Sequence, residues 1–512
     1  MPLSVSAQQN ADGGIPRLLN GVEYAGELNG MASGGDHAPF WLTSNQHGLV
    51  SVENYSSLLR GSLIRPIETD SMRKWRIGFG VDAAVGTNYT STFMLQQLYG
   101  EAQYKAGRLT IGAKERPMEL KNNELSTGSQ TLGINARPIP QVRLELPDWW
   151  QVPLTRGWLQ FKGHISYGRF TDDHWQHEFT HKQERYADNT LYHSKSGLLR
   201  IGKDSDKYPL SMEIGLEMAA QFGGTTYEPT AEGMQASKNA TNLKAFWYAF
   251  VPGGADAYES EFGYGNALGN SLGSYLLRIN YDKPNWRLSL YADHFFEDHS
   301  AMLMMDYNGY GTGDRWNEYD HRTFLLYDLK DMLLGGELLL KQGTWIRNIV
   351  AEYIYSKYQS GAVYHDHNPG ASDHIAGMDN YYNHNLYAGW QHWGQVIGNP
   401  LYQSPIYNTD GKIVISNNRF MAFHIGLGGQ PTPELSYRLL ATWRDGLGTY
   451  IKPYTHRKEQ VNIMAEANYA FRQKSLKGWS VGLGIGYDNG DIVGNNFGGM
   501  LKIKKTGLLR TQ

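Results

Sequence analysis

The chain has 512 residues, no cysteine and a formal net charge of −3, and it lacks a basic stripe of the kind that nucleic-acid-binding proteins use to displace phosphate counterions. Aromatic residues make up 13% of the chain, charged residues only 19%, and there are 59 glycines and 34 tyrosines, as is typical of many strands and turns in an amphipathic environment. No linker-like stretch divides the chain, so we expect one large domain.

The first nine residues, MPLSVSAQQ, have the features of the end of a secretory signal, because small residues precede two glutamines. The basic and long apolar parts of a signal are missing, and an ordinary amino terminus is the alternative. We predict cleavage near Ala7 and a single mature domain over 10–512.

Segments across the chain alternate between apolar and polar residues with period two, which places the apolar side chains on one face of a strand. The clearest are GWLQFKGHISYG (157–168), ELSYRLLATWR (434–444) and GWSVGLGIGY (478–487). In each of them an aromatic residue lies at or near an end of the apolar stripe, where membrane barrels carry their aromatic girdles.

A transmembrane β-barrel is favoured over a soluble β-sandwich, the alternative fold whose strands also alternate between apolar and polar residues. No segment approaches the roughly 18 apolar residues of a membrane helix, and only a closed barrel otherwise satisfies every backbone group in lipid. The strands are long, and their polar faces carry Arg, Lys, Glu and Asp. We therefore predict an all-β antiparallel barrel in an outer membrane.

Long and short connections also alternate, as they do between external loops and periplasmic turns. Long stretches are expected at 171–195, 223–270, 297–332 and 360–412, with a shorter one at 446–458. If YDLKDMLL (327–334) is helical, the count is about eighteen strands, from near Gly21 to near Lys505.

Five segments of the chain resemble the Wzi-type capsule assembly proteins of Bacteroidetes-like bacteria: APFWLTSNQHGLVS, LSTGSQTLGINARPIPQVRLELPDWW, GWLQFKGHISYGRF, LYHSKSGLLRIGK and AEYIYSKYQSGAVYHD. The resemblance covers most of the chain. It implies an outer-membrane barrel with a blocked lumen, whose outer loops act as a lectin that holds capsular polysaccharide at the cell surface. The end of the chain, KKTGLLRTQ, departs from the terminal aromatic residue of many such barrels.

An early aromatic pair, Phe40 and Trp41, follows a proline and precedes a polar turn. We expect both residues to anchor this segment against the barrel or its rim, with Asn45, Gln46 and Gly48 turning into a strand near Asn54. The alternative is that Trp41 stacks on a sugar.

Sugar recognition needs flat aromatic faces next to amides, carboxylates or cations, and three long loops combine them. The loop at 379–395 has the most aromatic residues. For any one residue, packing between loops is at least as good an explanation as sugar contact. The candidate polysaccharide-binding residues are Trp390, Trp393, Tyr381, Tyr382, Tyr387, Trp175, Arg185, Trp316, Tyr310 and Arg315.

Metal binding and catalysis have weaker support in the sequence. The histidines of YHDHNPGASDH and DHWQHEFTH match no recognised ligand spacing, and no G-x-S-x-G elbow appears. We therefore expect no cofactor, no metal and no enzymatic activity. The expected partners are capsular polysaccharide and outer-membrane lipids, with a monomeric barrel and no nucleic acid; a solute channel is the alternative function.

Overall fold

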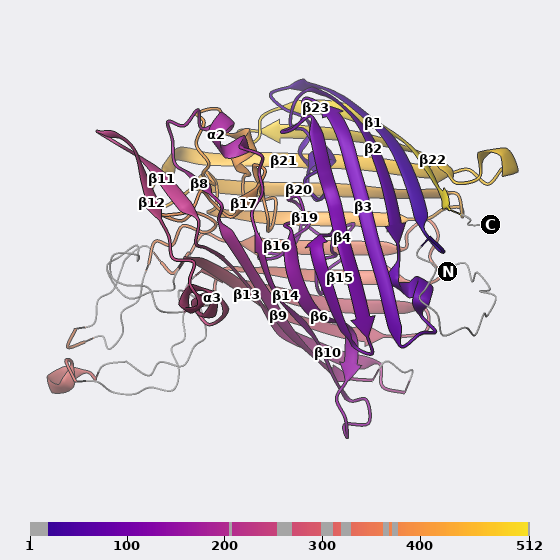
Figure 1. Cartoon of the computed structure of the whole chain (residues 1–512), viewed down its shortest axis with the longest axis horizontal. Helices are drawn as coiled ribbons and strands as arrows, with labels where there is room; N and C mark the ends of the chain where they lie inside the picture. The colour runs from indigo at the N-terminus through magenta and orange to yellow at the C-terminus, as the bar shows by residue number, and fades with distance from the viewer. Residues whose placement is uncertain are drawn as a thin grey trace.

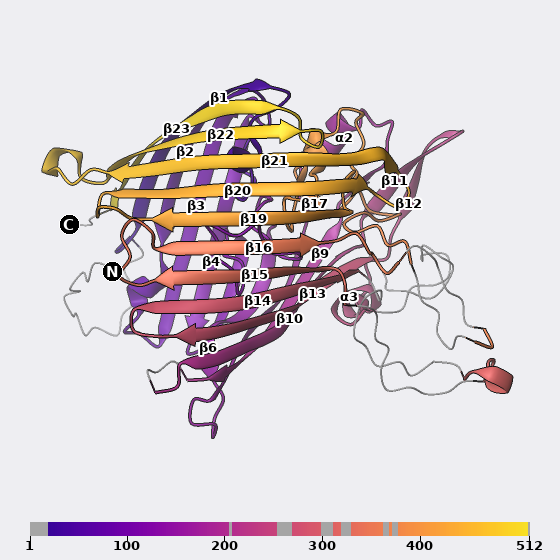
Figure 2. The same cartoon turned by 180° about the vertical axis from the view of Figure 1, so that it is seen from behind.

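The computed structural model describes residues 19–203, 207–252, 269–297, 311–318, 329–361, 368–370 and 377–509. Eighteen strands form a closed antiparallel barrel, in which β1 pairs with both β2 and β23 (Figures 1 and 2). The barrel strands are β1 (Glu23–Gly35), β2 (Tyr55–Arg65), β3 (Trp75–Thr87), β4 (Phe93–Tyr104), β5 (Gly107–Ala113), β6 (Gln141–Gln151), β7 (Leu159–Arg169), β9 (Leu191–Gly202), β10 (Leu210–Phe222), β13 (Asn270–Asp282), β14 (Trp286–Glu297), β15 (Met332–Leu340), β16 (Asn348–Tyr355), β19 (Phe420–Gly429), β20 (Leu435–Gly448), β21 (Pro453–Ala470), β22 (Trp479–Gly490) and β23 (Asn496–Leu508).

The predicted fold class and strand number are therefore confirmed. The helical assignment of 327–334 is wrong where the structure describes it, because Met332, Leu333 and Leu334 open strand β15 and pair with β16. Leu333 is completely buried and Leu334 is 43% exposed, which is the alternation of a strand between a lumen and a lipid face. The number of strands remains even, because residues 332–334 extend the strand β15 at its start and do not form an additional strand.

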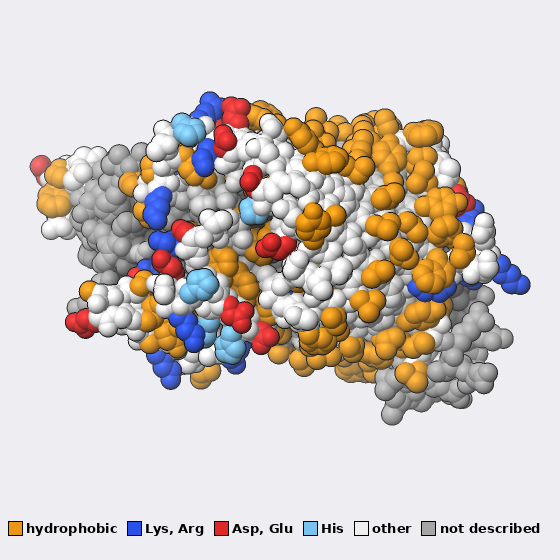
Figure 3. All heavy atoms as spheres, turned by 90° about the horizontal axis from the view of Figure 1, so that it is seen from above, with side chains coloured by type: hydrophobic (Ala, Val, Ile, Leu, Met, Phe, Trp, Pro, Cys, Tyr) orange, Lys and Arg blue, Asp and Glu red, His pale blue; other side chains and the backbone are white. Residues whose placement is uncertain are grey.

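A band of apolar side chains covers the outer surface of the barrel wall (Figure 3). In β22 the outward residues Leu483 and Ile485 are 58% and 54% exposed, while Gly482, Gly484 and Gly486 face inward and are buried. Exposed aromatic residues flank the band at both ends of the strands, as in membrane barrels. They include Trp75, Tyr104, Trp150, Trp158, Tyr469 and Trp479 at one end, and Tyr55, Phe93, Phe423, Tyr487 and Phe497 at the other.

The two ends of the barrel differ in their connections. One end, here called the loop end, carries the long connections 36–54, 114–140, 170–190, 223–269 and 356–419 (Figure 1). The opposite end, the turn end, carries short connections such as those between β4 and β5 and between β13 and β14, and β1 begins there. The connection between β20 and β21 is shorter than expected.

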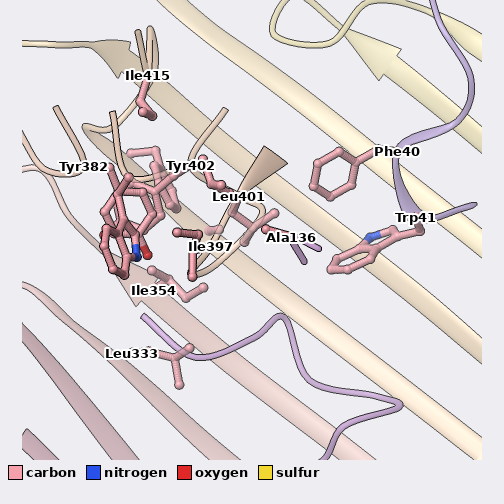
Figure 4. Packing of buried hydrophobic residues seen from close by; sticks show 14 of the residues in the cluster. Phe40, Trp41, Ala136, Leu333, Ile354, Tyr382, Ile397, Leu401, Tyr402 and Ile415 are labelled. Carbon is pink, nitrogen blue, oxygen red and sulfur yellow. The ribbon is translucent and has the colours of Figure 1, made fainter. Parts of the chain in front are cut away.

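Part of the loop end folds into the lumen and is here called the plug. The plug consists of the connections 36–54 and 114–140 and of residues 377–418 from the connection 356–419. Each bonds to inward side chains of the wall. Trp41 Nε1 donates to Thr442 Oγ1 (3.0 Å), Thr127 N donates to Glu352 (2.7 Å), and the Arg444 guanidinium donates to the carbonyl of Leu401 (2.7 Å). Apolar side chains of the plug and the wall then form one core inside the lumen (Figure 4).

The anchoring role predicted for Phe40 and Trp41 is confirmed. They lie in the short helix α1 (Phe40–Thr43) and are 2% and 1% exposed. Inward glycines of β22 make room for this helix, since a Cβ on Gly484 would lie 2.9 Å from Leu42 and one on Gly486 would lie 2.4 Å from Pro39.

Below the plug, the turn-end half of the lumen holds cavities of about 530, 560 and 600 Å³. Charged residues of the wall and the plug line them, including the ion pair of Lys162 and Glu119 (2.8 Å). Two further cavities, lined mainly by plug residues, are only about 100 and 40 Å³. Within the described residues, none of the helices has the length and apolar character that crossing a membrane requires.

Candidate functional site

The candidate residues at 379–395 divide into a buried and a half-buried group. Trp390, Tyr381 and Tyr382 are completely buried and Tyr387 is 2% exposed. Trp390 Nε1 donates to the carbonyl of Thr131 (3.1 Å). Trp390, Tyr381 and Tyr382 pack in the core of the lumen, and the hydroxyl of Tyr387 donates to the carbonyl of Gly223 in a neighbouring loop (3.2 Å). Packing between loops is the alternative that the sequence left open.

Trp393 is half-buried and lies in a strained turn. Trp393 and Gly394 form the two-residue turn between the strands β17 (Gln391–His392) and β18 (Gln395–Val396). Their φ values are 56° for Trp393 and 80° for Gly394. A two-residue turn with both φ values positive favours Asn and Gly, and a left-handed tryptophan costs about 1–2 kcal/mol. The chain therefore carries an indole where an asparagine would be less strained, which is common at functional positions.

Around Trp393 lies a group of apolar side chains here called the loop-end aromatic cluster. It consists of the buried Trp175, Tyr186, Ala388 and Ile413 and the half-buried Phe179, Tyr227, Met234 and Trp393. Trp175 stacks on Phe179 (4.8 Å between centroids), and Tyr186 stacks on Tyr227 (4.5 Å). Gly394 is required there, because a Cβ would lie 2.6 Å from the Trp175 ring.

The cluster joins segments that are far apart in the sequence. Trp175 and Phe179 come from α2 (Trp175–Phe179), and Tyr186 comes from β8 (Tyr186–Asp188). Tyr227 lies on β11 (Thr225–Thr230), which pairs with both β8 and β12 (Gly233–Lys238). Two long loops, 170–190 and 223–269, thus meet the plug at one place on the loop end.

Charged and polar groups border the cluster. Arg185 pairs with Glu228 and donates to the carbonyl of His384 (3.4 Å), so it ties three segments together. The Arg137 guanidinium lies 4.1 Å from the centre of the Trp393 ring. Burial lowers the pKa of Arg137 to about 10, which leaves it protonated at neutral pH.

Three other candidates are not members of the cluster. Trp316 is 38% exposed and follows the short 3₁₀ helix η2 (Gly313–Arg315), on which Arg315 is exposed. Tyr310 lies outside the described residues.

Sequence reasoning missed Arg137 and Tyr227 as neighbours of the candidate tryptophans. Neither lies in an aromatic-rich stretch, and both are brought to the site by tertiary contacts. Among the described residues, no three His, Asp or Glu side chains come together in a way that could hold a metal ion.

The burial of His392 predicts that the packing of the site depends on pH. Its ring is 2% exposed, with Nδ1 2.8 Å from the carbonyl oxygen of Arg137 and Nε2 2.6 Å from that of Thr171. Burial lowers its pKa from 6.5 to about 4, outweighing those two carbonyls, with Arg137 lowering it further and Asp172 raising it. Because the unfolded segment binds a proton between these two pH values and the folded one does not, stability falls as pH drops from 6.5 towards 4.

We expect the segment 377–418 to lose protection from trypsin between about pH 7 and about pH 5, at up to about 1.4 kcal/mol per pH unit. Cleavage would be measured on protein in detergent, corrected for the activity of trypsin at each pH. His392→Asn should flatten the dependence. Equal protection of the wild-type segment at both pH values would contradict the role of His392.

No protein-family model matches the chain, and no curated protein matches it in sequence. Among solved structures, the chain is similar to Wzi, an outer-membrane protein involved in group 1 capsule assembly in Escherichia coli and described as a carbohydrate-binding β-barrel. The identity is 13% and the TM-score 0.55, over 95% of this chain and 85% of that one. The chain also matches Acinetobacter baumannii OccAB4 (11% identity, TM-score 0.43, 96% and 100% covered) and Pseudomonas aeruginosa OccK5 (9%, 0.44, 96% and 98%). The likeness to Wzi supports the barrel fold.

Proposed function

We propose that this protein is an outer-membrane barrel that binds capsular polysaccharide through its loop end and retains it at the cell surface without catalysis. The observation that carries the proposal is Trp393, held in a strained turn beside Arg137 and a cluster of half-buried aromatic rings. Strain at an indole that is only half-buried is explained if the ring has a ligand. The likeness in fold to Wzi agrees with this proposal.

The apolar band and its two aromatic girdles support a membrane location. We propose that the loop end faces the cell exterior, because membrane barrels of this type have short periplasmic turns and long external loops. In this proposal residues 1–9 belong to an export signal and 10–512 form one monomeric domain. Lipids surround it, and nucleic acid is not a partner.

The cluster offers what a polysaccharide needs. In this proposal the C–H face of a pyranose stacks on the half-buried ring of Trp393, and its hydroxyl groups meet the side chain of Arg185 at the border of the cluster. One stacking contact is weak, at about 1 kcal/mol. A polymer repeats its epitope, so rebinding multiplies the retention of each weak contact.

A solute channel is the second candidate, favoured by the cavities at the turn end. The plug argues against it. Its side chains fill the loop-end half of the lumen and are hydrogen-bonded to the wall.

The test is the replacement Trp393→Asn, which removes the indole and suits the turn. We expect cell-bound polysaccharide to fall about tenfold or more, with the missing polymer in the medium. Cell-bound and shed polysaccharide would be measured together with the amount of folded barrel, scored by heat-modifiable migration in gels.

Trp345→Asn is the matched control, because Trp345 is 71% exposed but lies in a connection at the turn end. It should leave retention unchanged. Normal retention in Trp393→Asn with normal protein would remove Trp393 from the site. A loss in Trp345→Asn alone would instead indicate that the turn end faces outward.

A further inference from the structure

A short helix, α3 (Leu243–Phe250), lies against the outside of the barrel at the loop end (Figure 2). The side chain of Asn242 caps it by accepting from Ala245 N (3.0 Å), and Pro252 follows its end. One face of the helix, with Ala245 and Ala249, packs on Phe222 and Ala220 of β10.

The residues under α3 face away from the lumen. Phe222 and Ala220 have the same parity along β10 as Ile214, which is 37% exposed on the outer wall. Tyr167 of β7 likewise has the parity of Ile165, which is 44% exposed, and its hydroxyl donates to the carbonyl of Phe246 (2.9 Å). The helix therefore covers the outer wall, not the barrel mouth.

The opposite face of α3 is an exposed apolar stripe. Leu243 and Trp247, four residues apart on one side of the helix, are 89% and 58% exposed, and Val251, which follows the helix in an extended conformation, is 43% exposed. The helix has no acidic residue, whereas Lys244 on it and Lys238 just before it are both exposed.

The helix itself lies next to the apolar band of the barrel. Ile165 in the band is only two residues, about 7 Å, from Tyr167, whose ring contacts the helix. Tryptophan and leucine on one face, with lysines beside them, are typical of helices that lie flat at a membrane surface. Exposed lysines next to such a face favour anionic headgroups.

We propose that α3 is an interfacial helix, which inserts Leu243, Trp247 and Val251 into the lipid leaflet at the loop end and sets Lys238 and Lys244 against its anionic headgroups. This inference rests on the membrane location proposed above. The helix thereby holds the described part of the connection 223–269, residues 223–252, to the lipid surface and fixes the depth of the barrel.

The absence of cysteine from the chain makes single-site labelling clean. Leu243→Cys and Trp247→Cys would each be labelled with the fluorophore NBD, and the full-length protein reconstituted in phosphatidylcholine vesicles that contain phosphatidylglycerol. We expect brominated lipid to quench both labels several-fold more than it quenches a label at Gln235→Cys, on the exposed strand β12. Aqueous iodide should show the reverse order.

Leu483→Cys, in the apolar band, reports whether the barrel is in the bilayer, and heat-modifiable migration reports folding of each variant. Suppose that brominated lipid quenches the label at position 483, while only iodide quenches the labels at 243 and 247. This result would overturn the proposal of an interfacial helix and would leave the proposal of a membrane barrel intact. Protection of 243 and 247 from both quenchers would overturn it too, since the chain itself would then cover the stripe. Failure of lipid quenching at 483 would overturn both proposals.

Discussion

The purified protein should conduct almost no current in planar bilayers, although barrels of about 16–18 strands leave an aqueous channel when their lumen is open. The reason is that the plug packs against the wall and is fixed to it. The ammonium of Lys121 lies 2.7 Å from Asp293, and Asn122 donates to Glu337 (2.8 Å). These bonds are between buried or half-buried groups, so ordinary salt screens them little.

A plug deletion is the positive control for insertion. Replacing 119–136 by a short Gly-Ser linker keeps the neighbouring strands β5 and β6 joined at the same end. This variant should show steps of conductance, because the middle of the lumen loses its filling. Steady, large conductance of the wild-type protein at low voltage would contradict the sealed lumen and favour the channel.

Trp390→Ala should loosen the plug rather than act on a ligand. The indole is completely buried, lies parallel to Tyr192 (6.2 Å between centroids) and donates to Thr131. Removing a buried tryptophan leaves a cavity and an unpaired carbonyl, at a cost of about 3–5 kcal/mol. Hydrogen exchange of 377–418 should accelerate accordingly, while the barrel strands stay protected by their own pairing.

Trp390→Phe is the matched variant, since it keeps one aromatic ring in the core and loses the indole donor and part of the ring volume. It should cost less than the alanine variant. Unchanged exchange in Trp390→Ala would show that the plug does not depend on this residue. Comparison with Trp393→Asn then separates plug stability from retention of polysaccharide.

The barrel could be predicted from the sequence because lipid and lumen impose opposite demands on successive residues. In β22 the alternation of Leu483 and Ile485 with glycines is visible without a structure. The start of β15 was missed, because Met332, Leu333 and Leu334 continue an apolar run that has no alternation.

The plug could not be predicted as such. Segment 114–140 is polar, and polar residues usually indicate exposure, yet Thr127, Gln130 and Asn135 are at most 1% exposed. The wall supplies hydrogen-bond partners to Thr127 and Gln130, and another plug segment supplies those of Asn135, so the partners come together only in the closed barrel. The burial of Trp390 could not be predicted for the same reason, because its asparagine-rich and histidine-rich neighbourhood is typical of an external loop.

The position of α1 has a consequence for assembly. The chain leaves β1, enters the lumen and bonds to the last two strands: Phe40 N donates to Asp488 (2.8 Å) and His37 N donates to Asn496 (2.7 Å). These contacts span almost the whole sequence, as does the pairing of β1 with β23, and contacts of such long separation form late. Closing the wall and seating the first plug segment are therefore one cooperative event. Until β22 and β23 have paired, Phe40 and Trp41 have no complete packing surface. A partly assembled barrel therefore exposes these two aromatic residues, and their exposure distinguishes it from the closed barrel.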